Sequence, residues 1–184
     1  MSNASTVVLG ANCPGSSTTV AEGIPLEVTL TIQDTATCTP MPGAAVYVWH
    51  CDAPGRYSLY SQGVTNENYL RGVQEADANG QVHFTTIVPG CYAGRWPHIH
   101  FEVFDALSSV QQGSSSIKTS QLALPQDMCE VAYGDSRYPQ STQNLAQLSL
   151  ETDNVFSDDG GVHQLATITG DNAVGYTATL AFGV

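Results

Sequence analysis

The sequence has little positive charge. Its 184 residues include five Lys or Arg against 17 Asp or Glu, which gives a formal net charge of −12. Nucleic-acid binding depends on clustered cations that face phosphates, so we expect no nucleic acid as a partner. The acidity also disfavours anionic small molecules and favours neutral ones, although it would serve solubility equally well.

Long apolar runs and sequence repeats are also missing. No segment approaches the roughly 20 apolar residues that cross a bilayer, so we expect no membrane span. The sequence has no heptad pattern and no Cys-x-x-Cys spacing of the kind common in zinc sites. A chain of this length then has the size of one domain that can bury its own core.

The residues that are present indicate β-structure. Hydrophobic residues make up 42% of the chain, and alternating apolar and polar positions bounded by Gly and Pro predict strands. We predict an all-β fold, an antiparallel two-layer β-sandwich of seven to eight strands with long loops and at most one short helix. The helix is expected from Gln126 to about Ala132, and residues 138–157 are expected to form a long ordered loop. The expected strands cover residues 26–32, 44–49, 81–87, 98–104, 117–124, 162–168 and 176–182.

Residues 1–25 are expected to lie outside the sandwich. Met1-Ser2-Asn3-Ala4 resembles an initiator methionine followed by residues left from cloning, and the remainder is rich in Ser, Thr, Gly and Pro, as in an extended arm. Residues 26–184 form the predicted sandwich domain. The sequence leaves two questions open: whether the full-length protein has an additional domain, and what its oligomeric state is.

The cysteines bear on the cellular compartment in which the protein is found. There are five, at positions 13, 38, 51, 91 and 129, so at least one thiol is unpaired. Together with an acidic, Lys-poor surface they predict a secreted or extracytoplasmic protein that can hold disulfides.

A His-x-His pattern lies in the expected strand 98–104. Successive side chains of a strand point to opposite faces, so His98 and His100 share one face and make half of a metal site. The simpler alternative is two polar residues on a solvated strand face. Tyr92 lies just upstream and Tyr57 farther up, so a set of two tyrosines and two histidines can be assembled. Phenolate and imidazole ligands together suit a hard ferric ion.

The segments around these four residues resemble the intradiol ring-cleavage dioxygenases, the non-haem iron(III) family that opens catechols between the two hydroxyl-bearing carbons. The resemblance covers nearly everything after about residue 25, with a further echo at Thr119-Ser120-Gln121. The matching segments, all in family order, are VYVWHCDAPGRY at 46–57, LRG at 70–72, DANGQ at 77–81, TTIVPGCY at 85–92 and RWPHIH at 95–100.

The resemblance implies a chemical role for six residues. Tyr57 and His98 would be equatorial ligands of Fe(3+), and Tyr92 and His100 would be axial ones. Tyr92 would also accept a proton from the incoming catechol. Arg95 would stabilise negative charge that builds on the ring, and Gln121 would donate a hydrogen bond near the substrate oxygen. The implied partners are a small phenolic substrate and O2, and the implied products are muconic acids.

The resemblance also implies a disulfide and a difference from several relatives. A Cys-x-Pro and a Trp-His-Cys occur together in exported relatives, which makes Cys38–Cys51 the expected bridge. Several intradiol enzymes carry an amino-terminal helical segment that makes a dimer contact and covers the active site. No amphipathic helix precedes residue 26 here.

Other readings stay open at this point. The sandwich could bind a phenolic or carbohydrate ligand without turnover, or it could belong to the transthyretin-like hydrolases, which the two tyrosines disfavour. A zinc site is the rival metal assignment. Aromatic side chains could line the pocket or simply pack the core. The residues concerned are His50, His83, Cys51 and Cys91 for zinc, and Trp49, Tyr60, Tyr69 and Trp96 for the pocket.

Overall fold

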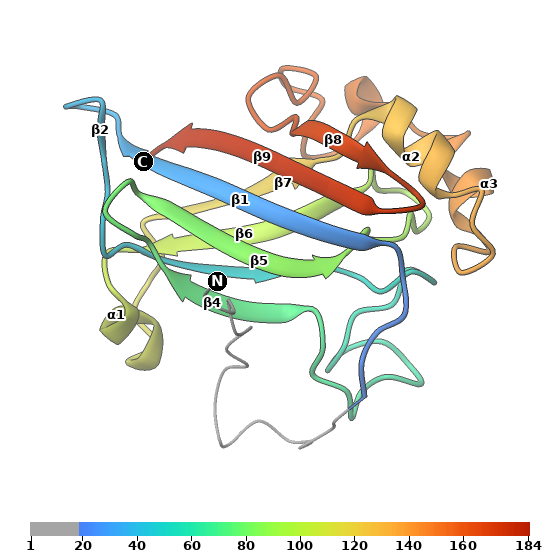
Figure 1. Cartoon of the computed structure of the whole chain (residues 1–184), viewed down its shortest axis with the longest axis horizontal. Helices are drawn as coiled ribbons and strands as arrows, with labels where there is room; N and C mark the ends of the chain where they lie inside the picture. Colours follow the sequence, from blue (N-terminus) through green and yellow to red (C-terminus); the bar gives the residue numbers. More distant parts are fainter. Residues whose placement is uncertain (1–18) are drawn as a thin grey trace.

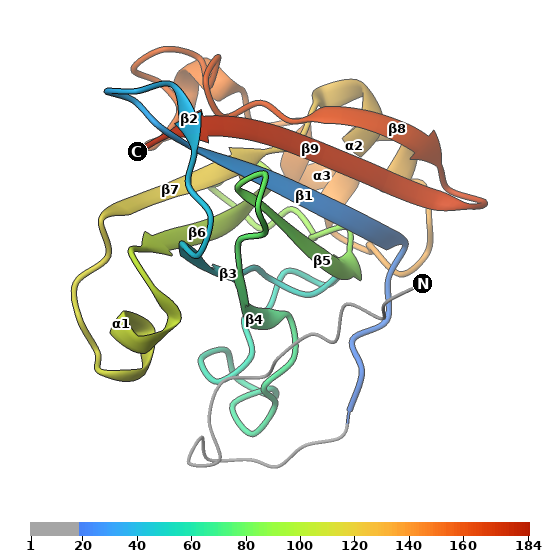
Figure 2. The same cartoon turned by 60° about the vertical axis from the view of Figure 1, so that its left-hand side comes forward.

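A computed structural model describes residues 19–184, in which two β-sheets pack face to face (Figures 1 and 2). The first sheet has the order β2-β1-β9-β8, and β5 also pairs with β1, along Pro25–Thr31. The second has the order β4-β3-β6-β7. The strands are β1 (Pro25–Asp34), β2 (Thr39–Pro40), β3 (Ala45–Trp49), β4 (Arg71–Glu75), β5 (Gln81–Ile87), β6 (His98–Phe104), β7 (Lys118–Ala123), β8 (Thr167–Asp171) and β9 (Gly175–Gly183).

The core lies between the two sheets and follows the alternation of the sequence. In β1 the side chains of Leu26, Val28, Leu30 and Ile32 are buried, while the residues between them are exposed or half-buried. In β6 the core positions are 99, 101 and 103, so positions 98, 100 and 102 occupy the opposite face. The predicted all-β sandwich is therefore confirmed.

One pairing departs from the antiparallel pattern that the sequence led us to expect. β1 and β9 are parallel, with Leu26 opposite Tyr176 and Gln33 opposite Gly183. Every other strand pair of the two sheets is antiparallel. The chain visits the second sheet between β1 and β9, so their connection is no hairpin and no short turn dictates their direction.

The helical content exceeds the single helix expected. The helix α2 (Gln126–Ala132) has the predicted bounds, but α1 (Leu107–Gln111), α3 (Ser141–Leu145) and a 3-10 turn, η1 (Leu150–Thr152), are additional. The prediction of a long loop over residues 138–157 was therefore wrong. Helices of five residues or fewer cover little more than one turn, so no helical period can be read from them. α2 and α3 lie together beside one end of the sheets (Figure 1).

Three strand assignments also needed correction. β4 has a Gly at its second position and only two buried residues, which hides it from a search for alternation. β2 is a two-residue pairing beside the end of β1. β8 starts at Thr167, five residues later than expected, because the segment before it forms turns and β8 itself is exposed.

The expected Cys38–Cys51 disulfide is absent. Both thiols are free, as are those of Cys91 and Cys129, while Cys13 lies outside the described residues. Cys38 is exposed in the turn between β1 and β2, whereas Cys51 follows β3 and its buried thiol donates to the Gly90 carbonyl at 3.3 Å. The whole of β3 separates them. Export stays a prediction that rests on surface composition.

Candidate metal centre

The two histidines of β6 stand on the outer face of the second sheet. Ile99 between them belongs to the core, so the ring nitrogens of His98 and His100 face away from it. Their Nε2 atoms lie 3.0 Å apart. β3 is the neighbouring strand, with Trp49 opposite His100, and the Trp49 and His100 rings stack at a centroid distance of 4.7 Å.

The two predicted tyrosines reach the same point from loops. Tyr57 Oη lies 3.3 Å from His98 Nε2 and 3.2 Å from His100 Nε2, and Tyr92 Oη lies 3.4 Å from His98 Nε2. The two phenol oxygens are 3.4 Å apart. The structure therefore brings all four predicted ligands together, although they come from one strand and two separate loops.

The spacing of these four atoms fits a metal ion. At a metal–ligand distance of about 2.1 Å, ligand atoms at right angles lie about 3.0 Å apart and ligands at a tetrahedral angle about 3.4 Å apart. Five of the six donor pairs fall between 3.0 and 3.4 Å. The sixth pair, Tyr92 Oη and His100 Nε2, makes no such contact.

The protein also fixes the His98 ring in the tautomer that a metal needs. Its Nδ1 donates to the backbone carbonyl of Trp96, two residues before it. The proton is then on Nδ1, and Nε2 presents a lone pair to the centre. His98 is only 2% exposed, so water does not compete for this arrangement.

Burial keeps the four groups neutral in the absence of a cation. It is the largest influence on both imidazoles, lowering the pKa of His98 to about 4 and that of His100 to about 3. Burial likewise raises the pKa of the Tyr57 and Tyr92 phenols above the ordinary value. Neutral imidazoles are ready ligands at pH 7, whereas the phenols would ionise only when a cation offsets the cost of the buried charge.

Two close contacts hold the tyrosine loops in place. Gly90, two residues before Tyr92, passes so near the Ala53 carbonyl oxygen that a Cβ there would lie 2.3 Å from it. Arg71 of β4 donates to the backbone carbonyl and the hydroxyl of Ser58, the residue after Tyr57. The first contact helps to fix the position of the Tyr92 phenol oxygen, and the second that of the Tyr57 phenol oxygen.

Arg95 and Gln121 meet beside the four ligands. Gln121 lies on β7 opposite His100, and its Oε1 accepts from Arg95 Nη2 at 2.6 Å. Arg95 also forms an ion pair with Asp153, with Nε 2.9 Å from Oδ2. The structure thus places Arg95 and Gln121 side by side next to the four candidate ligands, and the carboxylate paired with Arg95 is fully buried.

Sequence reasoning missed Asp153 and gave no role to Arg71. Asp153 follows η1 in the segment expected to be a long ordered loop, 58 residues after Arg95. Its direct neighbours in the sequence, Thr152 and Asn154, are polar, so no local signal marks it as a buried carboxylate. Arg71 lies in the segment 70–72, one of those that resemble the intradiol dioxygenases.

The other predicted residues are spread over the molecule. Trp96 is buried in the core, and Tyr60 is 82% exposed. His83 is exposed on β5 and pairs with Thr29. Among residues 19–184 no three His, Cys, Asp or Glu side chains are grouped so as to hold a metal, which leaves the zinc alternative without a ligand set.

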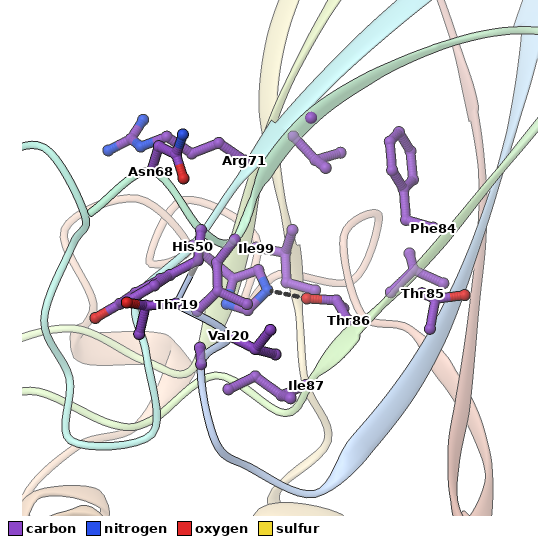
Figure 3. A pocket seen from close by; sticks show the side chains of 16 residues that line it. Thr19, Val20, His50, Asn68, Arg71, Phe84, Thr85, Thr86, Ile87 and Ile99 are labelled. Atoms are coloured by element: carbon purple, nitrogen blue, oxygen red, sulfur yellow. Dashed lines mark hydrogen bonds between the residues drawn. The ribbon is translucent and has the colours of Figure 1, made fainter. Parts of the chain in front are cut away.

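A cavity of about 390 Å³ opens between the edge strands β4 and β5 (Figure 3). Its walls are largely apolar and include Ile99 from the core face of β6, while His50 and Thr86 share a hydrogen bond of 2.7 Å. None of the four converging ligands lines this cavity, because they stand on the opposite face of the second sheet.

The fold and the converging residues agree with a dioxygenase, and comparison with known proteins places the chain. Residues 16–119, more than half of the chain, match the family described as dioxygenase. The intradiol ring-cleavage dioxygenase of Tetranychus urticae is 28% identical, and the match covers 89% of this chain and 81% of that one with a TM-score of 0.72. This chain belongs to the intradiol ring-cleavage dioxygenase family.

Two further relatives show how far the likeness extends. The dioxygenase domain of a dioxygenase carbohydrate-binding protein fusion from Streptomyces sp. SirexAA-E is 25% identical, with 94% of this chain and 86% of that one covered and a TM-score of 0.61. Catechol 1,2-dioxygenase of Pseudomonas sp. (strain EST1001) is 38% identical over 61 residues, 33% of this chain and 20% of that protein. The match thus spans about a fifth of the length of this curated relative.

No helix within residues 19–184 is long and apolar enough to span a membrane.

Proposed function

We propose that this chain is a non-haem iron(III) intradiol dioxygenase that cleaves catechol-type aromatic diols with O2 to give muconic acids. The observation that carries the proposal is the convergence of two phenol oxygens and two imidazole nitrogens, with five of their six pairs 3.0–3.4 Å apart. This donor set suits a hard cation with oxygen and nitrogen ligands. Family membership is the second support.

Each residue of the centre then has a defined task. Tyr57, Tyr92, His98 and His100 would hold the ion, and the two phenolates would lower its charge from three to one. Tyr92 Oη would take a proton from the incoming diol. Bound iron(III) supplies Lewis-acid activation of the aromatic substrate, so no external reductant is needed.

Arg95 would act on the substrate. It lies three residues before His98, is held on one side by Asp153 and Gln121, and contacts the centre's neighbourhood through Gln121, which stands opposite His100. A fixed N–H donor aimed at developing negative charge is among the larger contributions to catalysis.

Iron analysis and product identification test the proposal. The purified protein should contain about one iron per chain and be red to purple, since tyrosinate-to-iron(III) charge transfer absorbs visible light. Mixing it with catechol should consume O2 and yield cis,cis-muconate. A folded protein that stays colourless after iron loading, or one that cleaves the ring beside the hydroxyl-bearing carbons, would contradict the proposal. Catechol binding without O2 uptake would favour a non-catalytic binding module.

A further inference from the structure

The ion pair of Arg95 extends the candidate centre to a residue outside the ligand segments. Asp153 follows η1, and its carboxylate accepts from Arg95 Nε at 2.9 Å and from Arg95 Nη2 at 3.3 Å. The side chain of Asp153 is 0% exposed and that of Arg95 is 15% exposed. A buried pair of this kind keeps a fixed geometry, because each charge would be costly to leave alone.

Both oxygens of Asp153 are fully used as acceptors. Oδ2 accepts from Arg95 Nε and from the backbone N–H of Trp96 at 2.8 Å. Oδ1 accepts from Arg95 Nη2 and from the backbone N–H groups of Val155 at 2.8 Å and Phe156 at 3.2 Å. Burial alone would raise the pKa of Asp153, but the hydrogen bonds from Arg95 and from these backbone groups lower it. The group is therefore an ionised carboxylate with a fixed orientation at neutral pH.

This arrangement leaves one edge of the Arg95 guanidinium free. Nε is bound to Asp153, and Nη2 is shared between Asp153 and Gln121. Nη1 makes no hydrogen bond within residues 19–184, and 15% of the Arg95 side chain is exposed. The N–H groups available to a substrate are those of Nη1.

We propose that Asp153 is a positioning residue for the ring-cleavage reaction. Its carboxylate turns the Nη1 edge of Arg95 toward the substrate. The inference rests on the proposed function of this centre. Asp153 also offsets the charge of Arg95, so the guanidinium acts through two directed N–H donors more than as a free cation. Asp153 and Gln121 both hold the opposite edge of the guanidinium, because Gln121 accepts from the same Nη2 that Asp153 binds.

The replacement Asp153→Asn tests this role with little change of shape. An amide has one oxygen where the carboxylate has two, so the donors to one of the two oxygens would meet an NH2 group. Arg95 donates to both oxygens, through Nε and through Nη2, so it loses one hydrogen bond whichever way the amide is turned. Arg95 should lose its fixed orientation. We expect kcat to fall about 10- to 100-fold, the usual loss when a supporting hydrogen-bond partner is removed, with little change in KM.

Iron content and the visible absorption band are measured on the same sample, because they report whether the centre itself is intact. Both should stay within error of the unchanged protein, since none of the four candidate ligands touches Asp153. The matched control is Asp135→Asn, which removes the same kind of Asp–Arg pair, with Arg137 at 2.8 Å, on the surface. Its kcat should be unchanged.

A double replacement separates positioning from a structural role. If Asp153 acts through Arg95, then Asp153→Asn should cause little further loss of kcat in a protein that already carries Arg95→Ala. Equal losses in both backgrounds would overturn the proposal, and so would an Asp153→Asn protein with full kcat. If Asp153→Asn fails to fold, Asp153→Glu keeps the charge and moves it, and an unchanged kcat there would overturn the proposal as well. Failure of the unchanged protein to make muconate would instead contradict the proposed function.

Discussion

The two histidines of the centre are held by different means. His98 is fixed by a hydrogen bond to the Trp96 carbonyl, and His100 by stacking on Trp49 at a centroid distance of 4.7 Å. A hydrogen bond selects one tautomer, whereas stacking fixes the plane of the ring but leaves the proton free to sit on either nitrogen. The sequence shows both histidines, but neither of the contacts that orient them.

Removal of either ring should release the metal. We expect His98→Ala and His100→Ala to lose iron and the visible band together, with iron affinity at least about 10- to 100-fold lower, which is the loss produced by removing only a partner of a metal ligand. Metal analysis and absorption spectra of the purified variants check this. His83→Ala, at an exposed position on β5, is the matched control and should keep both. Full iron content in either centre variant would exclude that histidine as a ligand.

His50 predicts a pH dependence of stability. Burial, the largest influence, lowers the pKa of His50 to about 4, from an ordinary value of 6.5. The unfolded chain therefore binds a proton between these values while the folded chain does not. The contribution of His50 to stability is complete above pH 6.5 and is lost as the pH falls toward 4.

Urea unfolding of the metal-free protein at pH 6.5 and pH 5.5 measures this effect. Each buried histidine that stays neutral when folded adds up to about 1.4 kcal/mol per pH unit to the slope of the unfolding free energy. His50→Gln should lower the slope by about 1 kcal/mol over this interval, because the unfolded histidine is between about half and nine-tenths protonated there. Equal slopes for the unchanged protein and His50→Gln would contradict a buried neutral His50.

The sequence does not reveal residues whose role depends on tertiary contacts. His98 and His100 follow from the alternation of one strand, whereas Arg95 and Gln121 were assigned through the family resemblance. Asp153 is 58 residues from Arg95 and lies in a segment without a period, so only the packed structure shows that its carboxylate meets a guanidinium.

At the scale of elements, alternation was a reliable guide wherever a strand buries one face. β5 and β6 have the predicted bounds, and β1 contains the predicted strand. The guide failed for β8, whose residues are exposed or half-buried, and for α1, which has no buried residue. In those segments the sequence has no hydrophobic pattern because the element has no buried face to maintain.

The close approach of two loops makes one glycine critical. In Gly90→Ala the new Cβ would lie 2.3 Å from the Ala53 carbonyl oxygen and 2.8 Å from that of Asp52, and backbone atoms cannot move aside as a side chain can. We expect a loss of unfolding free energy of about 2–4 kcal/mol and, because Tyr92 follows two residues later, a lower iron content. Thermal unfolding and metal analysis check both.

Gly134→Ala is the matched control for that replacement. The nearest atom to its Cβ would be the Val131 carbonyl oxygen at 3.4 Å, an ordinary contact, so the melting temperature should change little. A Gly90→Ala protein as stable as Gly134→Ala would mean that the 52–54 loop can move away from residue 90.

At the scale of the whole molecule, the net charge of −12 predicts which catechols are accepted readily. A negative molecule repels an anionic substrate before contact, and salt screens this repulsion over a Debye length that shortens from about 30 Å at 0.01 M to about 8 Å at 0.15 M. We expect kcat/KM for a carboxylated catechol to rise a few-fold over this range. The value for neutral catechol should stay constant, and steady-state assays with both substrates check this. A fall for the carboxylated substrate would mean that local positive charge at the centre outweighs the net charge.

The parallel pairing of β1 and β9 has a consequence for the order in which the protein is made. β1 ends at Asp34 and β9 starts at Gly175, so a ribosome that adds about 5–20 residues per second delivers the partner of β1 on the order of 10 seconds after β1 itself. Over that interval β5 can pair with one edge of β1, but the edge that runs from Leu26 to Gln33 stays open. A chain interrupted before residue 175 would carry a row of unpaired backbone N–H and C=O groups along β1, an edge of the kind that adds to other chains. Correct synthesis of this sandwich therefore depends on protection of β1 until the last strand emerges.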